Sequence, residues 1–394
     1  MSRKICVVTS SRADYGLLKL LLKLIRDDSN LSLQLIATGT HFLKKYGETY
    51  QEIIEDGFVI EKKIEILSEK NDTLSVTESI GNGVNKFATA LKELKPDLVL
   101  LLGDRFEIFA AATASHVAQI PIIHIHGGEL TEGAIDDAFR HSITKMSQMH
   151  FVATQEYANR VIQLGEQPNR VIISGALGVD AIHNLKLLSK IELEEKLGFK
   201  FGTKNLLITF HPVTLESKEI SNQIDSLLAA LEELTDTTLI FTMPNADPDS
   251  QIISDAIEKF VRDNFNAKFF KSLGQLAYLS CIPFVDGVVG NSSSGILEVP
   301  SFRKGSVNIG DRQLGRIMPP SVINCEPSTL KIISAIKQLY SKPFKDMLET
   351  FTNPYGSLGA SIIIMEKIKK YDFGTNTKKK FFDIKLKQMT EEKI

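Results

Sequence analysis

The distribution of apolar residues along the first half of the chain constrains its fold more than any other feature. Short, continuous apolar runs alternate with longer segments in which apolar residues recur at helical spacing. A continuous run is typical of a strand in a parallel sheet, because helices cover both faces of such a sheet. We therefore expect strands at 5–9, 33–38, 98–102, 120–125 and 171–174, and helices at 15–26, 84–94, 106–117 and 156–164.

The second half repeats this alternation without repeating the sequence. A length of 394 residues suits two domains better than one core. The sequence predicts an α/β protein with two Rossmann-like domains, 1–180 and 181–358, and a last segment, 359–394, with a helix near 361–370 and a basic tail. In the second domain, strands are expected at 206–210, 238–241, 268–270, 285–289 and 306–309, and helices at 221–234, 250–265 and 273–281.

The charge balance excludes several classes of partner. The chain carries 46 Lys and Arg residues against 48 Asp and Glu residues, a formal net charge of −2. A protein that binds nucleic acid or an anionic membrane needs a basic excess, so we expect neither partner. Three cysteines far apart predict no disulfide framework or zinc site. Because no signal peptide or membrane-spanning run is found, we expect a cytoplasmic protein.

Polar residues gather directly after the expected strands, where open parallel sheets bind their ligands. Arg12 precedes a helix start, which suits a phosphate or, alternatively, a helix cap with a surface ion pair. His124 and His126, two residues apart on an expected strand, should face the same side. They could ligate a metal together with Glu129 or Asp104. The adjoining glycines instead favour close approach of a ligand to the backbone.

Carboxylates stand at two of these strand ends. Asp104 follows the strand expected at 98–102, where it could cap the next helix or act as an acid or base. Asp136 and Asp137 open a further helix, and we expect one of them to cap it. Two carboxylates in a common cleft push each other's pKa values apart, which suits acid–base catalysis.

The second half places a similar set of polar loops after its strands. Ser292 and Ser293 lie in the run 290–295 before a helix, where hydroxyl groups and bare backbone make an anion cradle. Arg312 follows the last expected strand and offers a bidentate guanidinium group. Any single loop could be ordinary turn chemistry, but so many polar loops on matching strand ends indicate a binding site.

Taken together, these motifs resemble the UDP-N-acetylglucosamine 2-epimerase family, in particular its hydrolysing, NeuC-like branch of sialic-acid-pathway enzymes. The resemblance covers nearly the whole chain, and the run RHSITK at 140–145 favours the hydrolysing branch. The other motifs that carry it are SRADY at 11–15, TGTH at 38–41 with YG at 46–47, GDR at 103–105, HIHGGE at 124–129, the helix start at 136, HPVT at 211–214, GNSSSG at 290–295 and GDRQ at 310–313.

The resemblance implies a GT-B-like fold, with two Rossmann-like domains, parallel sheets, an interdomain cleft and a C-terminal helix that crosses back to the first domain. It implies that UDP-N-acetylglucosamine and water give N-acetylmannosamine and UDP, by anti elimination to 2-acetamidoglucal and addition of water. It implies no metal and no cofactor, and it suggests a homodimer or homotetramer. Because the C2 proton of the sugar is barely acidic, elimination depends on departure of the diphosphate, which arginines and helix N-termini would stabilise.

By motif position, the resemblance also assigns roles to single residues. His126 stands where many relatives carry a catalytic Glu, so either His126 takes that role, which we favour, or Glu129 reaches in. Asp104 and Asp136 match the catalytic carboxylates, and His211 falls in the substrate cleft. The residues matched to the UDP site are Arg12 and Arg312 near the diphosphate, Ser292 and Ser293 in the phosphate loop, Glu298 at the ribose hydroxyls and Asn245 in a loop that lines the nucleotide.

Four other functions stay open on the sequence. The same reaction could act on UDP-2,4-diacetamido-2,4,6-trideoxyglucose of the legionaminic-acid pathway. A non-hydrolysing epimerase would return UDP to the sugar, and a GT-B glycosyltransferase would need an acceptor. A nucleotide-sugar sensor would bind without turnover. The carboxylates at several strand ends count against a sensor, because binding a diphosphate gains nothing from acids beside it.

Overall fold

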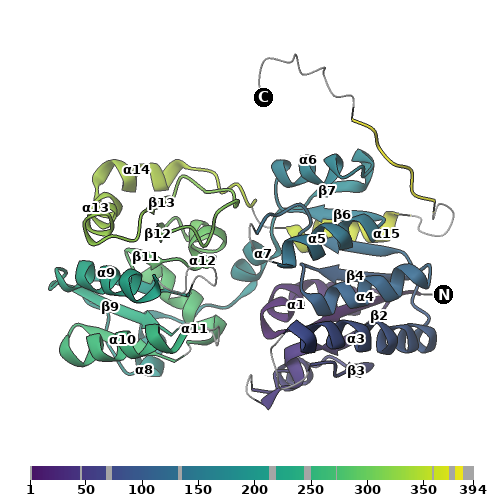
Figure 1. Ribbon diagram of the computed structural model, residues 1–394, viewed down its shortest axis with the longest axis horizontal. Coiled ribbons are helices and arrows are strands. Elements are labelled where there is room, and N and C mark those ends of the chain that lie inside the picture. The colour runs from purple at the N-terminus through teal and green to yellow at the C-terminus, as the bar shows by residue number, and fades with distance from the viewer. Residues whose placement is uncertain are drawn as a thin grey trace. The chain divides into compact units, whose positions relative to one another are not determined.

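The computed structural model describes residues 2–44, 47–67, 73–131, 135–212, 219–243, 250–271, 273–356, 359–371 and 378–384. The chain divides into two compact units. The first unit comprises Met1–Ala181 and Leu358–Ile394, and the second comprises Ile182–Ser357. Each unit is a twisted sheet with helices packed on both of its faces (Figure 1).

The first unit is built on a seven-stranded sheet in the order β3-β2-β1-β4-β5-β6-β7. All neighbouring strands are parallel. Strands β4, β5 and β6 are buried at every position, as continuous apolar runs require. The strands are β1 (Arg3–Thr9), β2 (Leu31–Thr38), β3 (Lys62–Ile64), β4 (Leu98–Leu102), β5 (Ile122–Ile125), β6 (Met149–Val152) and β7 (Val171–Ile173).

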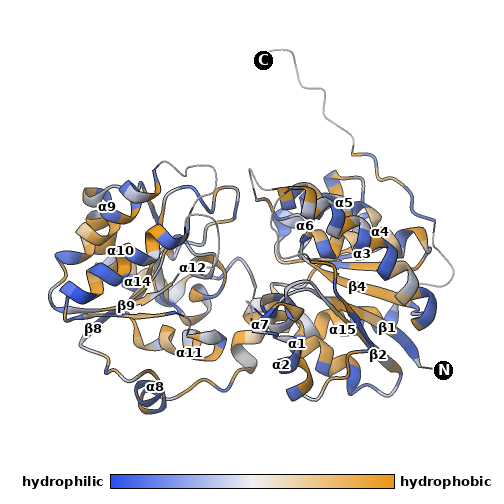
Figure 2. Ribbon diagram, turned by 60° about the horizontal axis from the view of Figure 1, so that its bottom comes forward, coloured by the Kyte–Doolittle hydropathy of each residue, from blue (hydrophilic) through white to orange (hydrophobic). Residues whose placement is uncertain are grey.

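Helices cover both faces of this sheet, with apolar residues turned inward (Figure 2). One core joins Ile5 and Val7 of β1 to α1 and α15, and the other joins Cys6 and Val8 to α3, α4 and α5. This alternation along β1 shows that the two cores lie on opposite faces. The helices are α1 (Arg12–Arg26), α2 (Tyr50–Glu55), α3 (Thr73–Leu94), α4 (Phe106–Val117), α5 (Ile135–Met146), α6 (Gln155–Gln163), α7 (Leu177–Asn184) and α15 (Ala360–Lys370), with short 3₁₀ turns at Gly39–Phe42 and Pro168–Arg170.

Helix α15 comes from the C-terminal part of the chain but belongs to the first unit. Its residues Ile364 and Ile368 are fully buried in the same core as α1. The carboxylate of Asp180 in α7 accepts hydrogen bonds from the backbone N–H groups of Gly359, at 2.6 Å, and Ser361. These bonds satisfy donors at the start of α15, where a helix has no internal partners for them.

The second unit contains a six-stranded, wholly parallel sheet in the order β10-β9-β8-β11-β12-β13. One core joins the sheet to α9, α10, α13 and α14, and another joins it to α8 and α11. The elements are α8 (Lys190–Leu197), β8 (Lys204–Thr209), α9 (Ile220–Glu232), β9 (Thr237–Thr242), α10 (Ser250–Asp263), β10 (Ala267–Phe270), α11 (Gly274–Cys281), β11 (Gly287–Gly290), α12 (Ser294–Leu297), β12 (Gly305–Ile309), β13 (Val322–Cys325), α13 (Thr329–Tyr340) and α14 (Lys342–Thr350), with 3₁₀ turns at Ile282–Phe284 and Val299–Phe302.

The predicted fold class is confirmed, because both units are α/β with Rossmann-like parallel sheets. The sequence patterns did not predict the short strands β3, β6 and β13. Within the described part of the chain, no helix combines the length and the apolar character that crossing a membrane requires.

Candidate active site

The strand ends of the first unit bring the predicted catalytic residues to one edge of the sheet. Leu102, the last residue of β4, pairs with Ile125, the last residue of β5. The loops that carry Asp104 and His126 therefore begin side by side. Helix α5 approaches the same edge, because its Arg140 contacts Asp104 directly.

Arg140 is the centre of this group, and it is only 4% exposed. Its guanidinium group forms an ion pair with Asp104 and donates hydrogen bonds to the Thr131 hydroxyl, at 2.9 Å, and to the Glu129 backbone carbonyl, at 2.8 Å. A further bond of 3.3 Å reaches Asp137 on the preceding turn of α5. A planar guanidinium group with several fixed donors can hold these loops in one arrangement.

Asp136 lies in the first turn of α5, and its environment differs from that of Asp104. Burial first, and then the neighbouring Asp104 carboxylate, together raise the pKa of Asp136 to about 6 against the opposing effect of Arg105 and Arg140. Asp104, in contrast, is held in an ion pair. One edge thus carries a carboxylate paired with a cation and a carboxyl group that can keep a proton near neutral pH, a combination suited to acid–base chemistry.

His126 and Glu129 form a pair beside these carboxylates. Nδ1 of His126 lies 3.2 Å from Oε1 of Glu129. Nε2 of His126 accepts a hydrogen bond of 3.3 Å from the backbone N–H of Leu177. Because Nε2 is an acceptor, a neutral His126 ring carries its proton on Nδ1 and donates it to Glu129. Both candidates for the position of the usual catalytic Glu are therefore joined in one hydrogen-bonded pair.

The expectation that His124 and His126 lie on one strand is wrong, because β5 ends at Ile125. His126 has a φ of 66°, in the left-handed region, so the period-two rule for strands stops before it. His124 is buried, donates from Nε2 to the Gly103 carbonyl at 2.8 Å, and accepts at Nδ1 from the Thr144 hydroxyl at 3.0 Å.

Burial lowers the pKa of His124 to about 3, so its ring is neutral and joins β4 to α5. A metal site in this region would require at least three clustered ligands. No group of three or more His, Cys, Asp or Glu side chains that could hold a metal ion is found among the residues that the structure describes.

Arg12 is the first residue of α1 and lies at the surface. Its Nε atom donates to Glu52 at 3.0 Å, and its side chain is 53% exposed. Ser11 caps the helix, with reciprocal bonds between Ser11 and Asp14 that form a capping box. This is the arrangement of a helix cap with a surface ion pair, and a contact between Arg12 and a phosphate stays a prediction.

The second unit has its own cluster of polar residues at the carboxyl ends of β8, β11 and β12. Asn291 lies at its centre and exchanges two hydrogen bonds with the backbone of His211, at 2.7 and 2.8 Å. The backbone carbonyl of Asn291 accepts hydrogen bonds from the side chains of Gln313, at 2.9 Å, and Arg312, at 3.2 Å. The structure thus brings together His211, predicted for the substrate cleft, and Arg312, predicted for the diphosphate site, through a third residue that the sequence patterns did not single out.

Close packing of β11 against β8 allows this cluster to form. Gly290 has a φ of 140°, and a Cβ atom there would lie 1.9 Å from the Thr209 carbonyl oxygen. Only glycine fits this position. Ser292 and Ser293 follow Asn291 and are half-buried, and their backbone carbonyls accept the first hydrogen bonds of α12.

His211 and Glu298 both have shifted pKa values. Burial, with the nearby positive charge of Arg312, lowers the pKa of His211 to about 4, so its ring is neutral at pH 7. Burial raises the pKa of Glu298, which follows α12. A neutral imidazole beside an arginine can donate to a phosphate or sugar oxygen without adding a second fixed charge.

One predicted residue, Asn245, lies outside the described residues. Two residues of the described clusters, Arg140 and Asn291, had no individual role in the sequence predictions. One sequence feature could have indicated Arg140: it lies four residues after Asp136, one helical turn along α5, and so on the same face of the helix.

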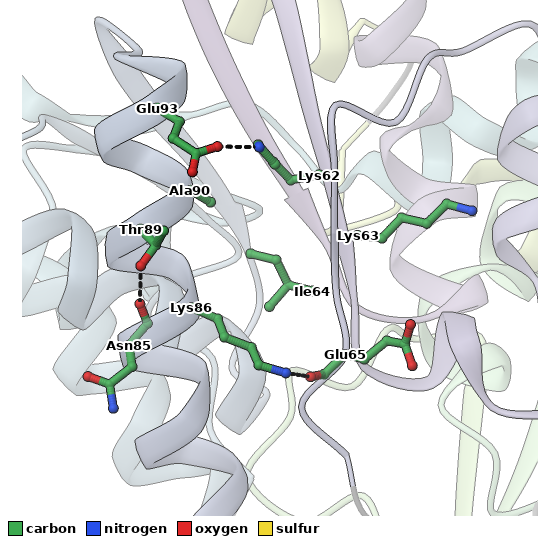
Figure 3. Close-up of a pocket in the computed structure, with 9 residues that line it drawn as sticks. All are labelled: Lys62, Lys63, Ile64, Glu65, Asn85, Lys86, Thr89, Ala90 and Glu93. Atoms are coloured by element: carbon green, nitrogen blue, oxygen red, sulfur yellow. Dashed lines mark hydrogen bonds and ion pairs between the residues drawn. The ribbon is translucent and has the colours of Figure 1, made fainter.

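A separate surface hollow lies between the edge strand β3 and helix α3 (Figure 3). An ion pair joins Lys62 to Glu93 across it, and Lys86 donates to the Glu65 carbonyl at 2.5 Å. None of the residues predicted for catalysis or nucleotide binding lines this hollow. The hollow is therefore separate from the candidate site.

Two α/β units, each built on a wholly parallel sheet and each with polar residues gathered at its strand ends, define a protein of the GT-B-like fold class. The family model described as UDP-N-acetylglucosamine 2-epimerase matches residues 23–369. The chain belongs to this family.

Relatives and a solved structure agree with this assignment. A GDP/UDP-N,N'-diacetylbacillosamine 2-epimerase (hydrolyzing) from Campylobacter jejuni is 43% identical over 87% of this chain and 89% of its own length. The polysialic acid biosynthesis protein P7 of Escherichia coli is 38% identical over 97% of this chain and 98% of its own length. The UDP-GlcNAc 2-epimerase of Neisseria meningitidis, solved with UDP-GlcNAc bound, has a TM-score of 0.82 at 21% identity over 93% of this chain and 100% of that one, which shows the shared fold.

Proposed function

We propose that this enzyme is a hydrolysing UDP-N-acetylglucosamine 2-epimerase, which converts UDP-N-acetylglucosamine and water into N-acetylmannosamine and UDP. The observation that carries the proposal is the pair Asp104 and Asp136, two carboxyl groups at one sheet edge in different electrostatic environments. Inversion at C2 requires one group that accepts a proton and another that returns one on the opposite face of the ring.

In the proposed first step, Asp104 removes the C2 proton while the bond between C1 and the diphosphate oxygen breaks. The C1=C2 double bond of 2-acetamidoglucal forms, and UDP leaves with the bonding electron pair. Asp104 suits this role because its ion pair with Arg140 holds it as a carboxylate. In the second step, Asp136, whose raised pKa lets it carry a proton near neutral pH, donates this proton to C2 while water adds to C1. The proton that water loses and the proton that Asp104 took in the first step pass to solvent, from which Asp136 is reprotonated.

The pair of His126 and Glu129 is proposed to act beside these carboxylates. A proton shared between Nδ1 and the Glu129 carboxylate at 3.2 Å can move with the charge that develops nearby. This arrangement supports a role in catalysis that His126 and Glu129 share. Replacing each one singly, and then both together, would show non-additive losses of turnover if the pair acts as one unit.

The polar residues of the second unit are proposed to bind UDP. Arg312 and the neutral ring of His211 would contact the diphosphate, with Ser292 and Ser293 as further donors. Asn245, Glu298 and, from the first unit, Arg12 are assigned to the same ligand through the family resemblance. Support for a phosphate contact is strongest for Arg312, because its hydrogen bond to Asn291 already orients the guanidinium group.

A second candidate substrate is UDP-2,4-diacetamido-2,4,6-trideoxyglucose. The relative at 43% identity is named for a diacetamido sugar, and this favours the same chemistry on that substrate. Incubation of the enzyme with each nucleotide sugar in deuterated water separates the two. We expect free UDP and a 2-epimerised sugar that carries deuterium at C2.

The sugar that is consumed with the higher kcat/KM identifies the substrate. A released sugar without deuterium at C2 would refute the elimination route. UDP that returns to the sugar, so that both epimers stay nucleotide-bound, would identify a non-hydrolysing enzyme. We further propose that the protein is cytoplasmic and that it forms a homodimer or homotetramer. Light scattering on the purified protein would test the oligomeric state.

A further inference from the structure

A buried carboxylate, Glu166, lies in the first unit and is surrounded by two lysine ammonium groups and an imidazole ring from three parts of the chain. Its oxygens lie 3.0 Å from Nε2 of His150, 2.9 Å from Nζ of Lys145 and 2.6 Å from Nζ of Lys379. The Glu166 side chain is fully buried. His150 is in β6 and Lys145 is in α5, whereas Lys379 belongs to the segment 378–384 near the C-terminus. The last part of the chain thus supplies an ion-pair partner to the core of the first unit.

Lys379 also contacts the end of α5 itself. Its Nζ donates to the backbone carbonyls of Lys145 and Ser147, each at 2.6 Å. The last carbonyls of a helix have no partner within the helix, and the helix dipole makes this end negative. The Lys379 ammonium group therefore satisfies two carbonyl groups and places a positive charge where the helix favours one.

Further contacts fix the segment that carries Lys379. The backbone N–H of Phe382 donates to the Gly165 carbonyl at 2.9 Å, and Gln167 donates to the Lys380 carbonyl at 3.3 Å. The Phe381 ring packs against Gly165 and lies 4.7 Å from Nζ of Lys145. We call residues 378–384 the C-terminal strap; it is drawn in yellow beside β6, β7 and α6 (Figure 1).

The opposite end of α5 carries the candidate acid. Asp136 lies in the first turn and Arg140 in the second, and Arg140 forms the ion pair with Asp104. A helix of 12 residues is ~18 Å long and moves as one rigid element. The backbone hydrogen bonds of α5 connect the contacts of Lys379 at one end to Asp136 and Arg140 at the other.

We propose that Lys379 is a positioning residue for catalysis, and that the C-terminal strap holds α5 in the register that places Asp136 and Arg140 against Asp104. This inference rests on the proposed function, because it assumes that Asp136 and Asp104 are the catalytic carboxyl groups. A displacement of ~1 Å in a catalytic group can cost ~100-fold in turnover. Two other contacts, Lys145 with Glu166 and Thr144 with His124, also hold α5, so we expect a loss of ~10-fold for Lys379 alone.

The test compares four variants of the full-length protein. Lys379→Met removes the charge and the donors and keeps most of the side-chain length. Lys379→Arg keeps the charge and should restore turnover. Lys380→Met is the matched control, because Lys380 is exposed and it is its backbone carbonyl, which the substitution keeps, that accepts the hydrogen bond from Gln167. Phe381→Ala is a milder variant that weakens docking of the strap; its ring is 62% exposed, so folding should not depend on it.

We expect Lys379→Met to lower kcat ~10-fold with KM changed less than ~2-fold, and Phe381→Ala to lower kcat by a smaller factor. Amide hydrogen exchange of residues 135–147 should become faster in both variants, while Lys380→Met and Lys379→Arg should resemble the wild type. Unchanged kcat in Lys379→Met and Phe381→Ala would overturn the proposal, even if both variants melt at a lower temperature.

Equal losses in Lys379→Arg and Lys379→Met would also overturn it, because a positioning charge would then not be the cause. Failure of the proposed function gives a different result. The wild type would then release no UDP from either nucleotide sugar, whereas the exchange measurement would still report whether the strap holds α5.

Discussion

Replacing Asp136 by Asn should stabilise the protein above neutral pH while it removes most of the turnover. Burial, and secondarily Asp104, raises the pKa of Asp136 from 3.8 to about 6. A carboxyl group with a higher pKa in the folded state binds its proton more tightly there. Its contribution to stability is therefore complete below the unfolded pKa of 3.8 and is lost as the pH rises through about 6.

The size of the effect follows from the same shift. A rise from 3.8 to about 6 corresponds to ~3 kcal/mol of ionisation free energy. Because the side chain is only partly buried, solvent screening reduces this value, and we expect ~2 kcal/mol. An Asn side chain has nearly the same shape but never ionises. The variant should therefore match the wild type near pH 4 and exceed its free energy of unfolding by ~2 kcal/mol above about pH 7.

Urea unfolding of both proteins across this pH range measures the difference directly. Asp137→Asn is the control, since Asp137 accepts from the Thr131 backbone at 2.8 Å and from Arg140, and its loss should destabilise by ~1 kcal/mol at every pH. In parallel, kcat of Asp136→Asn should fall at least ~100-fold. A stability difference between Asp136→Asn and wild type that stays constant from about pH 4 to pH 7.5 would show that the pKa of Asp136 is not raised.

Three further substitutions test the remaining contacts. Asp104→Asn should reduce kcat ~100-fold or more while it changes UDP affinity less than ~3-fold; titration calorimetry would show a collapse of UDP binding if Asp104 were only structural. Arg312→Ala should weaken UDP binding by ~1.5–3 kcal/mol, the range for hydrogen bonds to charged groups, and unchanged affinity would remove Arg312 from the diphosphate site. Gly290→Ala should lower the melting temperature and destabilise by ~3 kcal/mol or more, because its Cβ would overlap the Thr209 carbonyl; wild-type melting would contradict the close approach of β11 and β8.

Much of the fold could be predicted because the sheets are parallel. Strand β4 spans the predicted residues, since an apolar run such as Leu98–Leu102 suits a strand buried on both faces. The strands that escaped prediction have weaker patterns. β3 is an edge strand of three residues, two of them lysines, and β6 includes His150, whose partner Glu166 is distant in the sequence. A short or polar strand depends on tertiary partners that a local pattern does not contain.

The site could be predicted less completely, for a related physical reason. Position after a strand was enough to single out Asp104 and Arg312, because strand ends share an edge. The hydrogen bonds that organise these residues come from Arg140 and Asn291, whose roles depend on which loops meet in space. The histidines show the same limit: β5 ends at Ile125 and His126 adopts a left-handed conformation, which the local sequence pattern did not indicate.

The place of α15 in the first unit also affects how the chain can fold during synthesis. The ribosome makes the chain from its N-terminus, so α15 emerges after every strand of both sheets. Until then, the apolar face of α1 that packs against Ile364 and Ile368 stays exposed. The second unit needs no residue beyond Ser357 and can complete its own core first. The domain that begins the chain is therefore the last to mature, and nascent chains that stall before α15 should be preferred targets of chaperones and proteases.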